Sequence, residues 1–392
     1  MADASPLRVL FYTVNGKGLG HLMRALAIAR QMRRLAPETR FLFVTSCEDP
    51  AVLWREGFHY VKTLAPEAVE AHGRGLERHR TMAEQFMRAT FEGFQPHILV
   101  VDSFAYGSVG ELKPFLAGPW RRVLVSNLFL LQRDVTRYRE SVGHYDLVVF
   151  PFLAQEARGH PALADLPSPT IFAGPIAGVR PVDLMPRARA RATLGLPAEG
   201  PIVLIAAGGG GGESVAPVLA RATAALPLMP DLGFALLEPP LARDLPAIAW
   251  GPNVRIVRRV PIAPCLAAFD AAVTTAGMNS AAEMMTAGLP MVWTPLGPPS
   301  VDQGRNVARW TRAGIGCVPD GPGPEALAAA VRRVLEPATA AAMREAMAAS
   351  GAVDGATRAA EAILRRPKRP PPRPRIVRAG GTDHAQGEAD QR

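Results

Sequence analysis

The chain has 392 residues, 48% of them hydrophobic, which suits two domains with a buried core each, and its three widely spaced cysteines indicate neither a disulfide framework nor a zinc site. It has no apolar run of the ~18 to 20 residues that cross a bilayer and no signal-peptide pattern at its N-terminus, so we expect a soluble, cytoplasmic protein. More than half of the net charge of +9 lies from residue 365 onward, and no basic stripe is interleaved with aromatic residues, which disfavours specific nucleic-acid binding.

The N-terminal half alternates short apolar runs with helix-like segments. The runs are RVLFYTV, FLFVTS, YVKTL, HILVVD, RRVLVSN and DLVVF, and the expected helices span residues 21–35, 51–56 and 76–94. Continuous runs of Val, Ile, Leu and Phe between helices are typical of a parallel sheet that is covered on both faces. We predict a Rossmann-like N-terminal domain over residues 1–173 that binds the acceptor.

A glycine loop, NGKGLGH, follows the first strand. Gly16, Gly18 and Gly20 let the backbone turn tightly and approach a ligand before a helix begins at His21. A dinucleotide-binding loop is the obvious rival, but the spacing is G-x-G-x-G rather than G-x-G-x-x-G. The loop therefore predicts a ligand contact on the acceptor side of a cleft.

Two side chains near this loop are candidates for proton transfer. An imidazole titrates close to neutral pH, so His21 is a candidate general base, although it could instead cap or orient the loop. Asp102 ends the run HILVVD and could orient His21 and stabilise its protonated form; a structural Asx turn is the alternative. Arg24, one turn after His21, is a weaker candidate for binding an anion on the acceptor side.

A second series of elements follows a linker over residues 174–186 that is rich in Gly and Pro. Helices are expected at 187–194, 214–226, 279–287 and 304–313, with strands PIVLIAA, FALLE, VRIVR, AAVTT and MVWTP and Ala-rich helices up to residue 364. We predict a second doubly wound domain over residues 187–366. Two such domains in tandem place a ligand cleft between the carboxyl ends of their strands.

The first strand of this second series ends in a polyglycine loop, AAGGGGGES. Its consecutive glycines, Gly208, Gly209, Gly210, Gly211 and Gly212, leave N–H groups unobstructed and could hold a diphosphate, or could simply be flexible. The loop lacks the Lys and Ser/Thr of a P-loop, which disfavours nucleoside triphosphate hydrolysis.

The stretch from residue 274 to 307 is the most informative part of the chain. Asn279 and Ser280 fall where a helix should begin, so free N–H groups, short polar side chains and the helix dipole would face a phosphate. Glu283, one turn later, could accept hydrogen bonds from a ribose diol. Asp302 and Gln303, in the loop after MVWTP, could accept bonds from sugar hydroxyls. A capped helix with a solvated glutamate is the plainer alternative.

These residues resemble the donor-binding signature of UDP-dependent glycosyltransferases, both the plant type and the C-terminal domain of glycosyltransferase family 28. Gly277, Asn279, Ser280, Glu283, Asp302 and Gln303 fall on the family's phosphate, ribose and sugar positions with the spacing kept. Thr275 stands where plant members carry a phosphate-binding histidine, and Arg259 and Val260 stand where the family holds the base. The loop ending in His21 is similar to the GxGH entry of bacterial members.

The resemblance implies a GT-B fold, an α/β architecture of two Rossmann-like domains facing a central cleft. It implies a hexosyltransferase that moves sugar from a nucleotide diphosphate donor, UDP-linked, to a hydroxyl acceptor with inversion. A nucleotide-sugar hydrolase or epimerase of the same fold, and a non-catalytic sugar-nucleotide-binding protein, are the alternatives. No Asp-x-Asp motif ends a strand, so we expect neither a metal ion nor another cofactor.

The C-terminal run RRPKRPPPRPRIVRAGG is basic and rich in proline. Such a composition cannot pack a core, so we expect residues 367–392 to form a disordered tail. Contact with anionic lipid at the inner membrane face is one role for it, and a solubilising tail is the other. The sequence leaves the acceptor unidentified.

Overall fold

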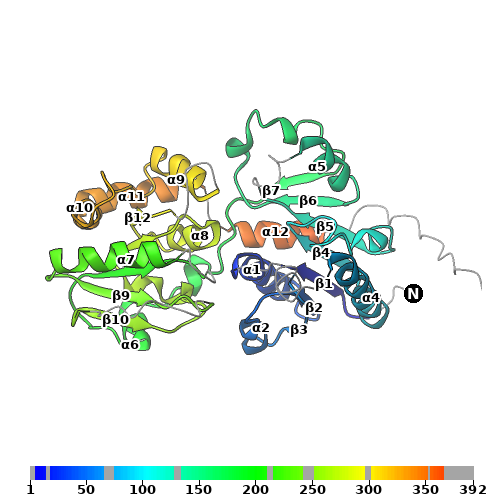
Figure 1. Cartoon of the computed structure of the whole chain (residues 1–392), viewed down its shortest axis with the longest axis horizontal. Helices are drawn as coiled ribbons and strands as arrows, with labels where there is room; N and C mark the ends of the chain where they lie inside the picture. The colour runs from blue at the N-terminus through cyan, green and yellow to red at the C-terminus, as the bar shows by residue number, and fades with distance from the viewer. Residues whose placement is uncertain are drawn as a thin grey trace, which may run out of the picture.

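Each half of the chain folds around its own parallel sheet, and Figure 1 shows the two resulting lobes side by side. The computed structural model describes residues 5–14, 18–65, 75–127, 134–209, 215–241, 251–295, 302–351 and 354–365. The predicted tail over residues 367–392 lies outside the described residues. In the part that is described, no helix has the length and apolar character needed to span a membrane.

The N-terminal lobe contains a seven-stranded sheet in the order β3-β2-β1-β4-β5-β6-β7. Its strands are β1 (Arg8–Thr13), β2 (Arg40–Thr45), β3 (His59–Lys62), β4 (Ile98–Asp102), β5 (Arg121–Val125), β6 (Leu147–Phe150) and β7 (Thr170–Phe172). The central strands are buried along their length because helices pack on both faces. One face is covered by α1 (Gly20–Leu35) and α2 (Ala51–Arg55), and the other by α4 (Leu76–Phe94) and α5 (Val135–Val142).

The C-terminal lobe contains a five-stranded sheet in the order β10-β9-β8-β11-β12. Its strands are β8 (Ile202–Ala206), β9 (Gly233–Leu237), β10 (Val254–Val257), β11 (Ala271–Thr274) and β12 (Met291–Trp293). Its helices are α6 (Arg187–Leu194), α7 (Ala216–Ala225), α8 (Met278–Thr286), α9 (Asp302–Arg312), α10 (Pro324–Leu335) and α11 (Pro337–Ala349). All strand pairs in both sheets are parallel, so the predicted α/β class with two doubly wound sheets is confirmed.

The last described helix, α12 (Gly355–Leu364), returns to the N-terminal lobe, where Figure 1 shows it in orange beside α1. Its buried face, Ala356, Ala359, Ala360 and Ile363, belongs to the core that also contains β1 and α1. The small side chains of its buried face let it lie close against α1. The expected C-terminal domain over residues 187–366 therefore does not hold its last helix.

The strand order places two reversal points opposite each other. The order reverses between β1 and β4 in one sheet and between β8 and β11 in the other, so the loops that follow these strands diverge and leave a crevice. His21 lies after β1 and Asp102 is the last residue of β4, while Gly208 and Gly277 follow β8 and β11. The fold thus gathers the four loops that the sequence singled out.

Candidate active site

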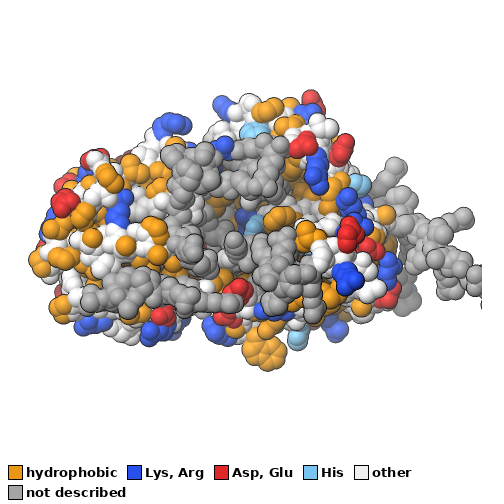
Figure 2. Space-filling view, in the orientation of Figure 1, with side chains coloured by type: hydrophobic (Ala, Val, Ile, Leu, Met, Phe, Trp, Pro, Cys, Tyr) orange, Lys and Arg blue, Asp and Glu red, His pale blue; other side chains and the backbone are white. Residues whose placement is uncertain are grey.

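A cavity of about 590 Å³ lies between the lobes, within the usual size range of small-molecule sites. Figure 2 shows a hollow in the middle of the face, with His and basic side chains at its floor. The N-terminal lobe lines the cavity with Gly18, Leu19, Gly20, His21, Met23, Arg24 and Asn127. The predicted site residues that line it from the C-terminal lobe are Gly208, Gly209, Arg259, Val260, Thr275, Gly277, Asn279, Ser280, Glu283 and Gln303.

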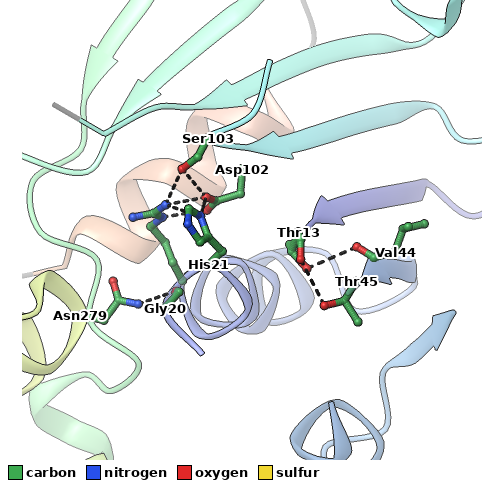
Figure 3. A network of polar contacts seen from close by, with 9 residues as sticks. Thr13, Gly20, His21, Val44, Thr45, Asp102, Ser103 and Asn279 are labelled. Atoms are coloured by element: carbon green, nitrogen blue, oxygen red, sulfur yellow. Dashed lines mark hydrogen bonds and ion pairs between the residues drawn. The ribbon is translucent and has the colours of Figure 1, made fainter. Parts of the chain in front are cut away.

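His21 and Asp102 meet as expected (Figure 3). His21 Nδ1 lies 2.5 Å from Asp102 Oδ1, and the imidazole remains partly exposed while the carboxylate is buried. Helix α1 carries the histidine in its first turn, and β4 ends at the aspartate, so the contact follows from the pairing of β1 with β4. The arrangement leaves Nε2 of His21 as the ring nitrogen without a contact in this network.

Arg24 contacts Asp102, and its expected anion contact on the acceptor side stays a prediction. Its Nε lies 2.8 Å from Asp102 Oδ2 and one terminal nitrogen lies 2.5 Å from Oδ1, so the pair is bidentate. The same nitrogen donates to Ser103 Oγ at 3.0 Å. Arg24 is only 5% exposed, and its Nε and one terminal nitrogen belong to this network.

Asp102 is held in its ionised form. Burial alone raises its pKa, but the charges of Arg24 and His21 and their hydrogen bonds outweigh burial and bring the pKa well below the usual range. The hydroxyl of Ser103 also donates to Asp102 Oδ1, at 2.8 Å. The carboxylate therefore accepts from three side chains, and the N–H of Phe104 donates to the backbone carbonyl of Asp102.

The start of α8 differs from the prediction. The helix begins at Met278 with Gly277 as its N-cap, one residue earlier than expected. The Asn279 side chain, expected at a phosphate, instead donates from Nδ2 to the carbonyl of Gly20 at 2.6 Å, across the cleft (Figure 3). Thr275 is buried beneath this turn, and Ser280 lines the cavity.

The described part of the polyglycine loop is in direct contact with its surroundings. Gly208 has φ +92°, and a Cβ there would lie 3.4 Å from Thr275 Oγ1. A Cβ on Gly209 would lie 3.3 Å from the side chain of Leu19, in the opposite lobe. Gly210, Gly211 and Gly212 lie outside the described residues, so their expected diphosphate contacts stay a prediction.

Glu283 lines the cavity but turns its carboxylate toward the linker. It accepts a hydrogen bond from the backbone N–H of Gly178, whose carbonyl in turn accepts from Arg30 Nη1 at 2.7 Å. Burial raises the pKa of Glu283 to about 7, although the Arg30 charge and the Gly178 N–H both act to lower it. In this conformation the carboxylate serves the junction between the lobes rather than standing free for a ribose.

Of the remaining predicted donor residues, three line the cavity and the side chain of the fourth is not described. Arg259 and Val260 lie along the cavity next to Ile262 and Leu266, which form an apolar wall. Gln303 lines the cavity near the start of α9. Asp302 is the first residue of α9, but its side chain lies outside what the structure describes.

Among the lining residues that the sequence analysis did not single out, three show why such contacts are hard to predict. Asn127 is the last residue of the run RRVLVSN, and its position just after the buried strand β5 was the signal for it. Leu19 lies across the cleft from Gly209, where a Cβ on the glycine would lie 3.3 Å from it, and no local pattern predicts this approach. Asn306 is buried and donates from Nδ2 to the carbonyl of Ala276 at 2.9 Å, so it fixes the turn before α8.

No combination of three or more His, Cys, Asp or Glu residues within the described ranges is arranged to hold a metal ion. Among the described residues, the charged side chains that line the cavity are those of His21 when protonated, Arg24, Arg259 and Glu283. The chemistry that these residues offer is proton transfer at His21 beside a pocket walled by glycine backbone and a helix start.

Comparison with known proteins supports this reading of the fold. No protein-family model matches the chain. Over 138 residues, 34% of the chain, it is 33% identical to UDP-N-acetylglucosamine--N-acetylmuramyl-(pentapeptide) pyrophosphoryl-undecaprenol N-acetylglucosamine transferases of Rhodococcus opacus and Rhodococcus jostii. The match spans about a third of the length of these curated relatives, 35%.

Solved structures match over nearly the whole chain. The glycotransferase of kitacinnamycin has a TM-score of 0.64 at 19% identity, over 91% of this chain and 98% of that one. MurG of Acinetobacter baumannii has a TM-score of 0.56 at 14% identity, over 91% of this chain and 99% of that one. At such identities the likeness shows the fold, and it confirms the predicted GT-B architecture. With the partial sequence relative, it also confirms the resemblance to family 28 glycosyltransferases.

Proposed function

We propose that this chain, which has the GT-B fold and resembles family 28 glycosyltransferases, moves a hexosyl group from a nucleotide diphosphate sugar to a hydroxyl acceptor. The observation that carries the proposal is the position of one cavity. It is walled by the His21–Asp102 pair from one lobe and by Gly208, Gly209 and the start of α8 from the other. A base therefore lies across from the groups suited to a diphosphate.

The reaction assigns one task to each wall. His21 Nε2 takes the proton of the acceptor hydroxyl while that oxygen forms a bond to the anomeric carbon, and Asp102 stabilises the resulting imidazolium. The bond between the anomeric carbon and the diphosphate oxygen breaks at the same time, and its electron pair leaves with the nucleoside diphosphate. Direct displacement of this kind inverts the anomeric configuration. Backbone N–H groups near Gly208 and Gly277 would stabilise the departing charge.

The donor nucleotide is proposed to be UDP. Arg259, Val260, Ile262 and Leu266 offer a guanidinium beside an apolar wall, a combination that suits the flat face and polar edge of a base. The segment matched by the Rhodococcus enzymes, whose names specify a UDP-linked donor, also supports this choice. Glu283 would reach the ribose only after releasing the Gly178 N–H.

The first experiment is a calorimetric titration of the full chain with UDP, TDP, GDP and their sugars. We expect UDP and at least one UDP-sugar to bind with dissociation constants between about 1 μM and 1 mM, the range of most enzyme substrates. Turnover of the bound donor without any acceptor would favour the hydrolase or epimerase alternative. Binding of none of the nucleotides would contradict the proposal.

Two further parts of the proposal concern the need for a metal ion or cofactor and the location of the protein in the cell. We propose that transfer needs no divalent ion or other cofactor, so activity after treatment with a chelator should equal that before it. We also propose a cytoplasmic protein whose basic C-terminal residues contact anionic lipid at the inner membrane face. Sedimentation of the full chain with phosphatidylglycerol vesicles, but not with phosphatidylcholine vesicles, would support that contact.

A further inference from the structure

We propose that Arg24 is a positioning residue that neutralises Asp102 and thereby keeps His21 an unprotonated base next to an anionic donor. The inference deepens the proposed function and rests on it. Its starting point is that Asp102 is shared by two partners from one helix, the imidazole of His21 and, one turn later, the guanidinium of Arg24. A plain His–Asp pair would lack the second partner.

The hydrogen bonds fix which nitrogen of His21 carries the proton. A guanidinium can only donate, and an ionised Asp102 can only accept. At 2.5 Å from Asp102 Oδ1, Nδ1 must therefore carry a hydrogen and donate it. The terminal nitrogen of Arg24, 3.3 Å from the same Nδ1, is then a positive neighbour rather than a hydrogen-bond partner. Nε2 keeps its lone pair for the acceptor proton.

The buried charges beside His21 set the cost of protonating it. Asp102 and Arg24 are 1% and 5% exposed, so their charges act on the imidazole with little screening. Together they sum to zero, whereas Asp102 alone would leave a full negative charge to stabilise an imidazolium. Ser103, the third partner, is uncharged, and the Phe104 ring lies 5.7 Å from the imidazole, centroid to centroid. Removing Arg24 should therefore favour the protonated histidine.

The positive charge of Arg24 is useful because the cavity is proposed to hold an anionic donor. A nucleotide diphosphate sugar brings two negative charges near the base, and these would raise the tendency of His21 to bind a proton before any acceptor arrives. A histidine that is already protonated cannot take the acceptor proton. Apart from Arg24, the described charged residues that line the cavity are Arg259, on the far lobe, and Glu283, which contacts the linker. Arg24 is the cation that lies against the pair itself.

The test is an NMR pH titration of His21 in the full chain, with the resonance assigned by comparison with His21→Gln. We expect the protonation midpoint in Arg24→Gln to rise by about one pH unit or more, and to rise less than half as far in Arg24→Lys, which keeps the charge. The acid limb of kcat/KM should move by the same amount in an enzyme assay. An unchanged or lower midpoint in Arg24→Gln would overturn the inference.

Arg24→Gln could fail to fold because it leaves the buried carboxylate of Asp102 without its cationic partner. A second pair of variants covers that case. The midpoint in Asp102→Asn is compared with that in Asp102→Asn/Arg24→Gln, which has no buried charge at this position. We expect the double variant to titrate at least half a pH unit higher, and equal midpoints would overturn the inference. Since the titration needs no turnover, it gives an answer even if wild-type protein transfers no sugar, the result that would defeat the proposed function.

Discussion

The two walls of the cavity are built on different principles. In the N-terminal lobe, His21, Asp102, Arg24 and Ser103 form a network of charged and polar side chains whose partners are already in place. In the C-terminal lobe the facing wall is mostly backbone and small residues, such as Gly208, with few ionic contacts. The proton-transfer side is thus organised before any ligand arrives, while the other side presents a helix start and glycine backbone to a ligand.

The largest effect is expected from removing the base, because this should abolish the function of the N-terminal wall and leave donor binding at the C-terminal wall intact. His21→Ala should lower turnover by ~10² or more, because proton abstraction is lost, while the dissociation constant for UDP changes little. Steady-state kinetics and calorimetry on the same sample measure the two quantities. His59→Ala, with an exposed side chain at the start of β3, is the control. Unchanged turnover in His21→Ala would remove the histidine from the mechanism.

A smaller effect is expected when the backbone wall is disturbed. At φ +92°, Gly208→Ala strains the loop and crowds Thr275, so the amides that face the donor should shift and UDP affinity should fall by about tenfold. The matched control is Gly200→Ala, at φ +84° with open space around its Cβ. Both variants should lose some stability, and calorimetry should show weaker UDP binding in Gly208→Ala alone. Equal UDP affinities would mean that this loop does not bind the donor.

The smallest expected effect is on the pH dependence of the free energy of unfolding, and it comes from Glu283 at the junction between the lobes. Glu283 has a folded-state pKa of about 7 against an ordinary value of 4.5, so the folded protein binds the proton more tightly. The free energy of unfolding should therefore fall as pH rises from about 4.5 to 7, and Glu283→Gln should remove that loss, worth about 1 to 3 kcal/mol.

Thermal unfolding at pH 5 and pH 8 measures the difference. The midpoint of Glu283→Gln relative to wild type should be a few degrees more favourable at pH 8 than at pH 5. Glu345→Gln, exposed on α11, is the control and should show no such change. A relative midpoint that is the same at both pH values would show that Glu283 is ionised without cost in the folded protein.

Local patterns were sufficient for most of the fold. The predicted helices over 76–94 and 187–194 match α4 and α6, because apolar periodicity and the residues at their ends act within a few positions. Strand β7 and helix α5 were missed: the first is three residues long, and the second, VTRYRESV, is mostly polar with only a single Asp134 cap as its signal. The crossing of α12 was missed because its Ala stripe fits either lobe equally well.

The sequence was sufficient to predict which residues lie at the candidate site, but it was less informative about which partners they contact. His21 and Asp102 were paired correctly because each follows a strand at the reversal point of the sheet, where the topology alone brings them together. Arg24 was assigned to the acceptor because its spacing from His21 says nothing about Asp102, far away in sequence. Asn279 and Glu283 contact Gly20 and Gly178, and partners in another lobe or a linker leave no local pattern.

The return of α12 to the first lobe has a mechanical consequence. Because the polypeptide passes between the lobes once near residue 174 and again near residue 354, two covalent crossings join them instead of one. The two crossings define an axis, so the cleft should open by rotation of one lobe about the line that joins them. Rotation of the lobes about other axes would stretch one of the crossings. A nick in either segment should then leave the halves associated through the other, and should free the motion that the pair restrains.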